Sequence, residues 1–161
     1  MPRLLVVHHS PTSGMRALTD AVVAGANDDS IEGVDVAVVP ALEATADDVL
    51  AADGYLLGTP ANFGYMSGAL KHFFDSLFLE IGGSLADDGS ASGAVAPGKK
   101  PFGLYVHGRY DTTGAIRSVL AITGALPWRQ VAETLDRTGD IGEDDLAAAY
   151  ELGGTLAALL A

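Results

Sequence analysis

The first residues that could do chemistry form a hydroxyl-rich segment near the N-terminus. Ser10, Thr12 and Ser13 lie between an apolar run and a stretch with helical periodicity, and Gly14 and Met15 follow them. Three hydroxyls can donate hydrogen bonds to phosphate oxygens, and glycine permits close approach of the backbone. Unpaired N–H groups and the dipole at a helix start also favour an anion. The segment therefore suits a phosphate, although Ser and Thr that only cap a helix are equally consistent with it.

Three familiar motifs are missing from the same part of the sequence. No Gly-x-x-x-x-Gly-Lys-Ser/Thr loop for nucleoside triphosphates occurs, and no Gly-x-Gly-x-x-Gly follows the first apolar run. Ser10 does not stand in a Gly-x-Ser-x-Gly turn, which argues against a hydrolase that combines Ser10 with His107 and an aspartate.

A second segment brings glycines, aromatic residues and an amide together in one turn. It reads Gly58-Thr59-Pro60-Ala61-Asn62-Phe63-Gly64-Tyr65-Met66-Ser67-Gly68-Ala69-Leu70-Lys71. Glycines allow backbone angles that other residues rarely adopt, and aromatic rings offer a flat apolar surface. At the end of a strand, such a turn can form a wall for a flat ring.

Short apolar runs predict strands over residues 3–8, 34–39, 54–58, 102–107 and 130–135. Helices are expected around residues 15–22, 49–51, 70–78 and 113–122, and a terminal one begins at 140–143. The helix over residues 70–78 has the clearest apolar stripe, with Leu70, Phe73, Phe74, Leu77 and Phe78 at helical spacing. Strands that alternate with helices predict an α/β fold, in which helices cover both faces of a mostly parallel sheet.

The loops after the first, third and fourth strands are the ones expected to bind a ligand. In open parallel sheets, ligands lie outside the carboxyl ends of the strands, where the strand order reverses. These loops are residues 10–16, 59–66 and 107–114. Residues 81–100, rich in Gly, Ser, Ala and Asp, are interpreted as a surface loop within a single domain that spans residues 1–161.

The segment 58–71 resembles the Gly-Thr/Ser-Pro-x-x-Phe/Tyr-Gly-x-Met/Ile segment of flavodoxin-like FMN proteins. The resemblance is strongest to the NAD(P)H:quinone oxidoreductases related to the tryptophan-repressor-binding protein (WrbA-like). It implies a flavodoxin-like three-layer sandwich with a five-stranded parallel sheet of order 2-1-3-4-5. It also implies that electrons pass from NAD(P)H through FMN to a quinone or similar acceptor. The alternatives are a flavodoxin-type electron carrier, which a partner protein reduces, and an interaction domain that has lost its cofactor.

The same resemblance implies which residues would contact the FMN. The phosphate would lie against Ser10, Thr12, Ser13, Gly14 and Met15, and the ring against Pro60, Ala61, Asn62, Phe63 and Gly64. The third loop would contribute His107, Gly108, Arg109 and Tyr110, and is bulkier and more charged than the glycine-rich loop of the quinone reductases. His107 and Arg109 are the candidates for a catalytic role, since a cation there can stabilise negative charge on the reduced ring.

Charge and composition restrict the partners. The net charge of −12 would repel nucleic acid and anionic lipid, and suits a basic redox protein, although most of the acidic pairs are expected to be solvated loops. With no cysteine, redox work would need an organic cofactor, and no cluster has metal-ligand spacing. Without a signal-peptide core or an apolar stretch of bilayer length, the chain is expected to be cytoplasmic, with no membrane partner. A homo-oligomer is left open.

Four other residues are interpreted as structural or surface residues. His8 and His9 are adjacent at a strand end, so their side chains point to opposite faces and do not share a metal. His72 lies beside the apolar stripe of its helix and is expected at the surface. Trp128 is expected to pack in the core or at an interface.

Overall fold

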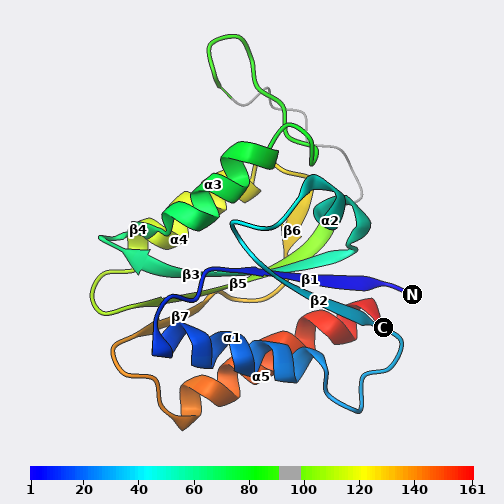
Figure 1. Ribbon diagram of the computed structural model, residues 1–161, viewed down its shortest axis with the longest axis vertical. Helices are drawn as coiled ribbons and strands as arrows, with labels where there is room; N and C mark the ends of the chain where they lie inside the picture. Colours follow the sequence, from blue (N-terminus) through cyan, green and yellow to red (C-terminus); the bar gives the residue numbers. More distant parts are fainter. Residues whose placement is uncertain (91–98) are drawn as a thin grey trace.

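A twisted, mainly parallel sheet separates two layers of helices in the computed structural model, which describes residues 1–90 and 99–161 (Figure 1). The strands are β1 (Arg3–His8), β2 (Asp35–Pro40), β3 (Gly54–Asn62), β4 (Tyr65–Met66), β5 (Lys100–Gly108), β6 (Trp128–Gln130) and β7 (Leu135–Thr138). The helices are α1 (Ser13–Ala26), α2 (Ala46–Ala51), α3 (Gly68–Leu77), α4 (Thr113–Thr123) and α5 (Glu143–Leu160).

The sheet has the order β2-β1-β3-β5-β6, with β7 beside β5 and the short β4 antiparallel to β3. The flavodoxin-like fold predicted from the sequence is confirmed, and so is the strand order. The described residues form seven strands rather than five, because β4 is a two-residue addition and the fifth predicted strand is divided. The order reverses between β1 and β3, so the carboxyl edge beside these two strands is where a ligand is expected.

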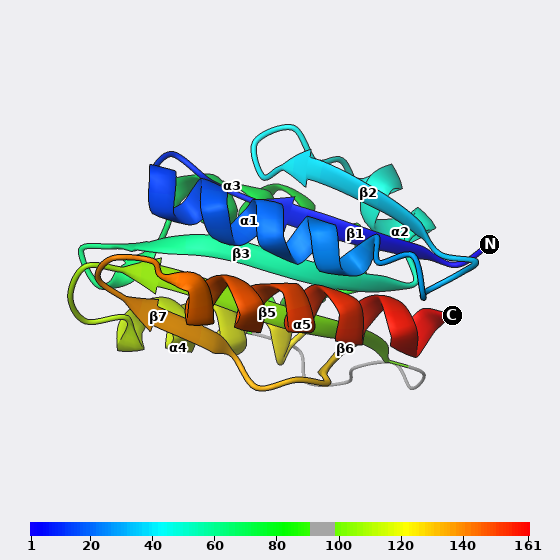
Figure 2. The same ribbon diagram turned by 90° about the horizontal axis from the view of Figure 1, so that it is seen from below.

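Each face of the sheet has its own apolar core. Helices α2, α3 and α4 cover one face, and α1 and α5 lie side by side on the other (Figure 2). Leu70, Phe73, Phe74 and Leu77 of the predicted stripe on α3 are buried, and Phe78, the C-cap residue, is half-buried. Trp128 stacks on Tyr55 with ring centroids 4.2 Å apart. His72 is exposed, as predicted. These contacts fix the sheet whose strand ends carry the candidate loops.

Helices α1 and α5 touch at glycines. A Cβ atom on Gly153 of α5 would overlap the carbonyl oxygen of Val22 in α1, and one on Gly25 would overlap the carbonyl oxygen of Tyr150. Backbone therefore packs directly against backbone at this crossing. The contact holds α1, and with it the hydroxyl-rich loop at its N-terminus, firmly on the sheet.

The prediction of one strand over residues 130–135 was wrong. Gln130 pairs with Phe102 and Leu135 pairs with Tyr105, so residues 131–134 lie opposite only residues 103–104 of β5. The surplus residues leave the ladder, and the Gln130 side-chain amide donates to Thr134 Oγ1 at 2.9 Å across the detour. Such a bulge is tolerated because this strand lies at the edge of the sheet.

The predicted surface loop over residues 81–100 is described only in part. Residues 81–90 form turns and irregular backbone with an isolated bridge at Leu85, Lys100 already belongs to β5, and residues 91–98 lie outside the described residues. No helix in the described part of the chain has both the length and the apolar character needed to cross a membrane.

Candidate functional site

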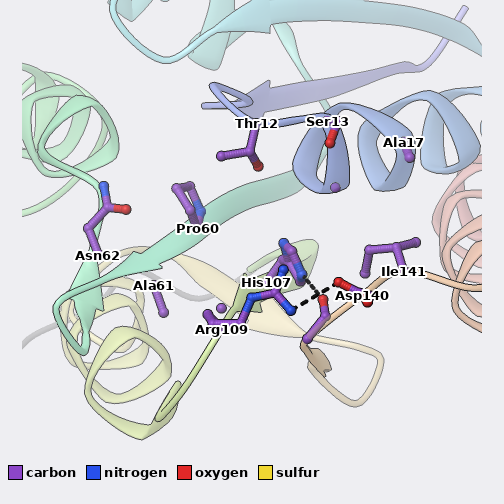
Figure 3. Close-up of a pocket in the computed structure, with 13 residues that line it drawn as sticks. Thr12, Ser13, Ala17, Pro60, Ala61, Asn62, His107, Arg109, Asp140 and Ile141 are labelled. Carbon is purple, nitrogen blue, oxygen red and sulfur yellow. Dashed lines mark hydrogen bonds and ion pairs between the residues drawn. The ribbon is translucent and has the colours of Figure 1, made fainter.

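A cleft of about 530 Å³ opens at the carboxyl edge of the sheet (Figure 3). Its walls come from the start of α1, the end of β3, the end of β5 and the turn between β7 and α5. Four chain segments that are far apart in sequence therefore meet here. The volume is typical of small-molecule and cofactor sites, which measure about 300–1,000 Å³.

The start of α1 forms one end of the cleft and is suited to an anion. Thr12 is the N-cap, and its Oγ1 accepts a hydrogen bond from the backbone N–H of Met15 at 3.2 Å. Thr12 and Ser13 are exposed, and no acidic residue stands in the first turn. The first N–H groups of a helix have no partner within the helix, and the dipole there is positive.

His107 lies directly beneath this helix start. A Cβ atom on Gly14 would be only 2.6 Å from His107 Cε1, so the helix can approach the imidazole only because residue 14 is glycine. His107 Nε2 lies 2.6 Å from the carbonyl oxygen of Gly139 and must donate to it, since a carbonyl only accepts. This bond joins the end of β5 to the turn after β7.

A tight hairpin forms the opposite wall of the cleft. Asn62 pairs with Tyr65, and the two residues between them, Phe63 and Gly64, have φ values of 51° and 78°. A bulky residue rarely adopts a positive φ, and doing so costs about 1–2 kcal/mol. The Phe63 side chain recovers none of this by packing, because it is fully exposed. Backbone strain of this kind concentrates at functional sites.

A second hollow, of about 570 Å³, continues from the first along this hairpin. The two share Ala61, Asn62 and Arg109. Phe63 and Tyr110, both highly exposed, come from opposite loops and line the second hollow. Together the two hollows make a groove that runs from the anion-receptive helix start to a pair of aromatic rings.

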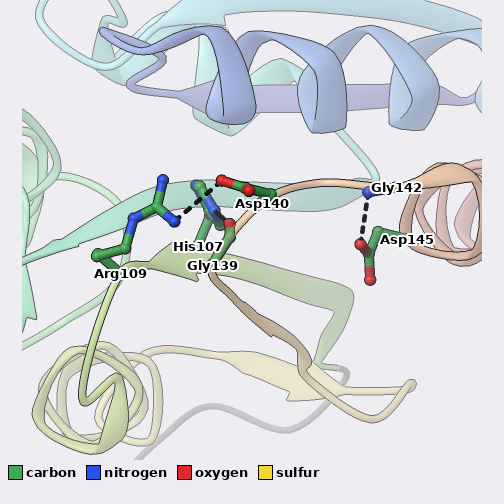
Figure 4. Close-up of polar contacts among 6 residues, drawn as sticks. All are labelled: His107, Arg109, Gly139, Asp140, Gly142 and Asp145. Carbon is green, nitrogen blue, oxygen red and sulfur yellow. Dashed lines mark hydrogen bonds and ion pairs between the residues drawn. The ribbon is translucent and has the colours of Figure 1, made fainter.

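Arg109 and Asp140 form an ion pair at the mouth of the groove, with Nη1 and Oδ1 3.0 Å apart (Figure 4). Both side chains are largely exposed, and exposed pairs contribute only about 0–1 kcal/mol. The guanidinium can therefore leave Asp140 for a ligand oxygen at little cost. Of the two predicted catalytic candidates, His107 is held by Gly139 and Arg109 is held only loosely.

The structure gathers most of the predicted site residues in this groove. Those lining the first hollow are Thr12, Ser13, Gly14, Pro60, Ala61, Asn62, His107, Gly108 and Arg109. The second adds Phe63, Gly64 and Tyr110. Ser10 and Met15 line neither: Met15 is fully buried in the core, and the Ser10 hydroxyl bonds inward to His8 and Thr19.

Five residues that line the groove were not among the predicted site residues, namely Ala17, Asp111, Gly139, Asp140 and Ile141. The last three form the turn after β7, which places them at the same edge as the other loops. The sequence analysis ended the last strand at residue 135, whereas β7 runs on to Thr138. The turn after the strand was therefore not recognised as a candidate loop. The Gly139-Asp140 pair was the signal in the sequence, because Gly and Asp are typical of turns. In the structure Gly139 has a φ of 80°. In the described residues, no group of three or more His, Cys, Asp or Glu side chains could hold a metal ion.

The sequence of this chain is similar to those of known proteins. The family model for NADPH-dependent FMN reductases matches residues 18–131. A flavodoxin of Aquifex aeolicus is 34% identical over 129 residues, which cover 71% of this chain and 69% of that protein. An NAD(P)H dehydrogenase (quinone) of Acidithiobacillus ferrooxidans is 32% identical over 113 residues, which cover 59% of this chain and 54% of that protein.

Solved structures with the same fold cover nearly the whole chain. An archaeal flavodoxin has a TM-score of 0.74 at 16% identity, covering 98% of both chains. A flavodoxin, WrbA-like protein from Agrobacterium tumefaciens has a TM-score of 0.70 at 18% identity, covering 99% of this chain and 98% of the other. At such identities the likeness shows the fold alone.

Proposed function

This chain belongs to the NADPH-dependent FMN reductase family, and from that premise we propose that it is an FMN-dependent oxidoreductase that passes electrons from NAD(P)H to a quinone or similar acceptor. The observation that carries the proposal is the groove of two adjoining hollows, which has an anion-receptive helix start at one end and two exposed aromatic rings at the other. FMN has a phosphate at one end and a flat ring at the other. The quinone dehydrogenase relative supports this choice of acceptor.

The residues present fit the cofactor. At the phosphate end, the first turn of α1 offers N–H groups and the hydroxyls of Thr12 and Ser13, and it carries no carboxylate that would repel a dianion. Gly14 leaves the space through which His107 approaches the helix start. At the ring end, Phe63 and Tyr110 offer flat surfaces. Bound FMN would supply the ability to accept and release electrons in one- or two-electron steps.

The chain's own residues would then orient the cofactor and stabilise charge. The strained hairpin holds the backbone of Ala61 and Asn62 at the wall of the groove. Arg109, released from Asp140, would place a positive charge at the mouth, where it can offset negative charge that develops on reduction. No residue needs to act as a general base, because the electron transfer itself is the work of the cofactor.

The test is to reconstitute the purified protein with FMN and mix it anaerobically with NADH or NADPH. We expect the visible flavin absorbance to fall with at least one of them and to return when a quinone is added. Absence of FMN binding would overturn the proposal altogether and favour an interaction domain without cofactor. If the protein binds FMN but neither nicotinamide reduces it, the proposal of an NAD(P)H-dependent enzyme is overturned and the electron carrier is favoured.

The second candidate is a flavodoxin-type electron carrier reduced by a partner protein. Two observations favour it: the flavodoxin of Aquifex aeolicus is the more similar of the two curated relatives above, and the net charge of −12 suits docking to a basic redox protein. An electron carrier would take electrons from a flavoprotein reductase but not from free NAD(P)H. Salt would slow that transfer by screening the attraction.

Phe63→Asn is expected to stabilise the protein while weakening FMN binding. Asparagine tolerates the left-handed backbone better than phenylalanine, so about 1 kcal/mol of strain should be relieved and the melting temperature should rise. Loss of the exposed ring should weaken FMN binding about 5- to 10-fold. Thermal unfolding without FMN and titration of FMN fluorescence measure the two effects.

Two other substitutions at the same position separate strain from ring contact. Phe63→Tyr keeps both the strain and the ring, so neither measurement should change much. Phe63→Leu keeps the strain but removes the ring, so only FMN binding should weaken. If Phe63→Asn lowers the melting temperature, the backbone conformation is not strained by the phenylalanine. If all three variants bind FMN equally, Phe63 does not contact the ring.

A further inference from the structure

Behind the candidate phosphate loop runs a line of four hydrogen-bonded side chains, here named the hydroxyl chain: His8, Ser10, Thr19 and Tyr105. Ser10 Oγ lies 2.8 Å from both His8 Nδ1 and Thr19 Oγ1, and Thr19 Oγ1 lies 2.8 Å from the hydroxyl of Tyr105. Tyr105 is fully buried and Thr19 almost so. The hydroxyl chain links the end of β1 to α1 and to the middle of β5.

The phenol of Tyr105 reaches Thr19 through a gap that the sheet leaves for it. Gly58 of β3 lies beside Tyr105 in the register, and a Cβ atom there would overlap the phenol ring. Residues 58 and 105 thus form a matched pair, glycine against tyrosine. An aliphatic side chain at residue 105 would bury as well in this core, so the hydroxyl calls for a separate explanation.

The proton positions along the hydroxyl chain follow from burial. Burial raises the pKa of Tyr105 far above its usual value, so the phenol keeps its proton and must donate it, because a buried donor without an acceptor is costly. Its acceptor is Thr19, which in turn donates to Ser10. Ser10 is then left to donate to His8 Nδ1.

His8 can accept this last hydrogen bond because it is neutral near pH 7. Burial lowers the pKa of His8, the neighbouring His9 lowers it further, and Asp20 of α1 opposes them. Its register partners on β2 and β3 are Pro40 and Gly58, which carry no charge. Each of the three hydroxyl hydrogens, on Tyr105, Thr19 and Ser10, therefore has an acceptor within the protein.

The hydroxyl of Ser10, which the sequence analysis predicted as a phosphate contact, is already bonded within the protein. Its hydroxyl donates to His8 and accepts from Thr19, and Ser10 does not line the groove. Only Pro11 separates it from Thr12, the N-cap of α1. The hydroxyl chain is thus positioned to fix the backbone that leads into the anion-receptive turn.

We propose that Thr19 and Tyr105 are positioning residues for the phosphate loop, and that they act through Ser10 to hold residues 10–14 ready for the phosphate of the cofactor. This inference rests on the proposed function. A loop held in its bound conformation before the ligand arrives loses less freedom on binding, and so binds more tightly. The hydroxyl chain supplies this rigidity from below, while the groove side of the loop stays free for the ligand.

The test compares FMN with riboflavin, which has the same ring but no phosphate. In Tyr105→Phe and Thr19→Val, the affinity for FMN is expected to fall about 5- to 10-fold, as for one lost hydrogen bond, while the affinity for riboflavin changes less than about twofold. Thr19→Ser should restore the FMN affinity, because it keeps the hydroxyl. Ser10→Ala combined with Tyr105→Phe should cost no more than either change alone, since the hydroxyl chain acts as a unit.

Tyr55→Phe is the matched control. Tyr55 is also a buried tyrosine with a raised pKa, and its hydroxyl donates to the carbonyl oxygen of Val49 at 2.7 Å, outside the hydroxyl chain. It should lower the melting temperature about as much as Tyr105→Phe without changing the ratio of FMN to riboflavin affinity. As a readout without ligand, the amides of residues 12–14 should exchange hydrogen faster in Tyr105→Phe than in Tyr55→Phe.

The outcomes distinguish this inference from the proposed function. If the unaltered protein does not bind FMN, both are overturned. If it binds FMN and Tyr105→Phe weakens FMN and riboflavin equally, or neither, the positioning role alone is overturned. If Ser10→Ala weakens FMN binding but Thr19→Val and Tyr105→Phe do not, Ser10 is a direct phosphate contact and the inference fails.

Discussion

Ser13→Asp is expected to weaken FMN binding by at least about 100-fold while riboflavin binding stays within about twofold. Ser13 is the first residue of α1 and lines the groove at its anion-receptive end. A carboxylate there would occupy the positive end of the helix dipole and repel the phosphate. Two like charges about 4 Å apart interact with about 4 kcal/mol near a protein surface, more than enough for a 100-fold loss.

The same substitution should not harm the fold. A negative charge in the first turn of a helix contributes about 0.3–1 kcal/mol of stability, so the melting temperature without ligand should stay the same or rise slightly. Ser13→Asn, which is similar in size but neutral, is the control and should retain FMN binding within a few-fold. Isothermal titration with both ligands measures the effect. Equal weakening of FMN and riboflavin would place the phosphate elsewhere.

Gly153→Ala is expected to destabilise the protein by about 2 kcal/mol, although alanine favours helix formation. The new methyl group would overlap the carbonyl oxygen of Val22, and backbone cannot move aside without separating α1 from α5. Overpacking of this kind costs about 1–3 kcal/mol. The start of α1 would shift with its helix, so FMN binding should weaken as well.

Gly154→Ala, one residue further along α5, is the matched control. A Cβ atom there meets the carbonyl oxygen of Gly25 at 3.4 Å, an ordinary contact, so the helix propensity of alanine should dominate. We expect Gly154→Ala to raise the stability by up to about 1 kcal/mol. Urea unfolding of the two variants beside the unaltered protein is the measurement. Equal effects of the two substitutions would show that the helices do not cross at Gly153.

Several features were readable from local sequence because their causes are local. The stripe from Leu70 to Phe78 needs only helical spacing to predict α3. The hydroxyl-rich start of α1 needs only Thr12 as a cap and the absence of a nearby carboxylate. The glycines and aromatic residues of the segment 58–71 pointed to the hairpin that forms one wall of the groove.

Features that depend on how distant segments pack could not be read in this way. The bulge at residues 131–134 arises because β6 and β7 pair with separate parts of β5, and no local pattern marks that register. Asp140 joined the site through its ion pair with Arg109, which is distant in sequence. Ser10 was predicted to face a phosphate, whereas its hydroxyl bonds to His8 and to the buried Thr19, which in turn bonds to Tyr105.

By itself, the sequence determined the fold class and the three loops where a ligand could bind, because apolar periodicity and turn residues act over short distances. The strand order followed from the resemblance of the segment 58–71 to flavodoxin-like proteins. Only the tertiary structure decided which side chains in those loops face the groove. That choice depends on competition between partners brought together by folding: the Ser10 hydroxyl bonds inward, while the Phe63 ring is held outward by a strained turn.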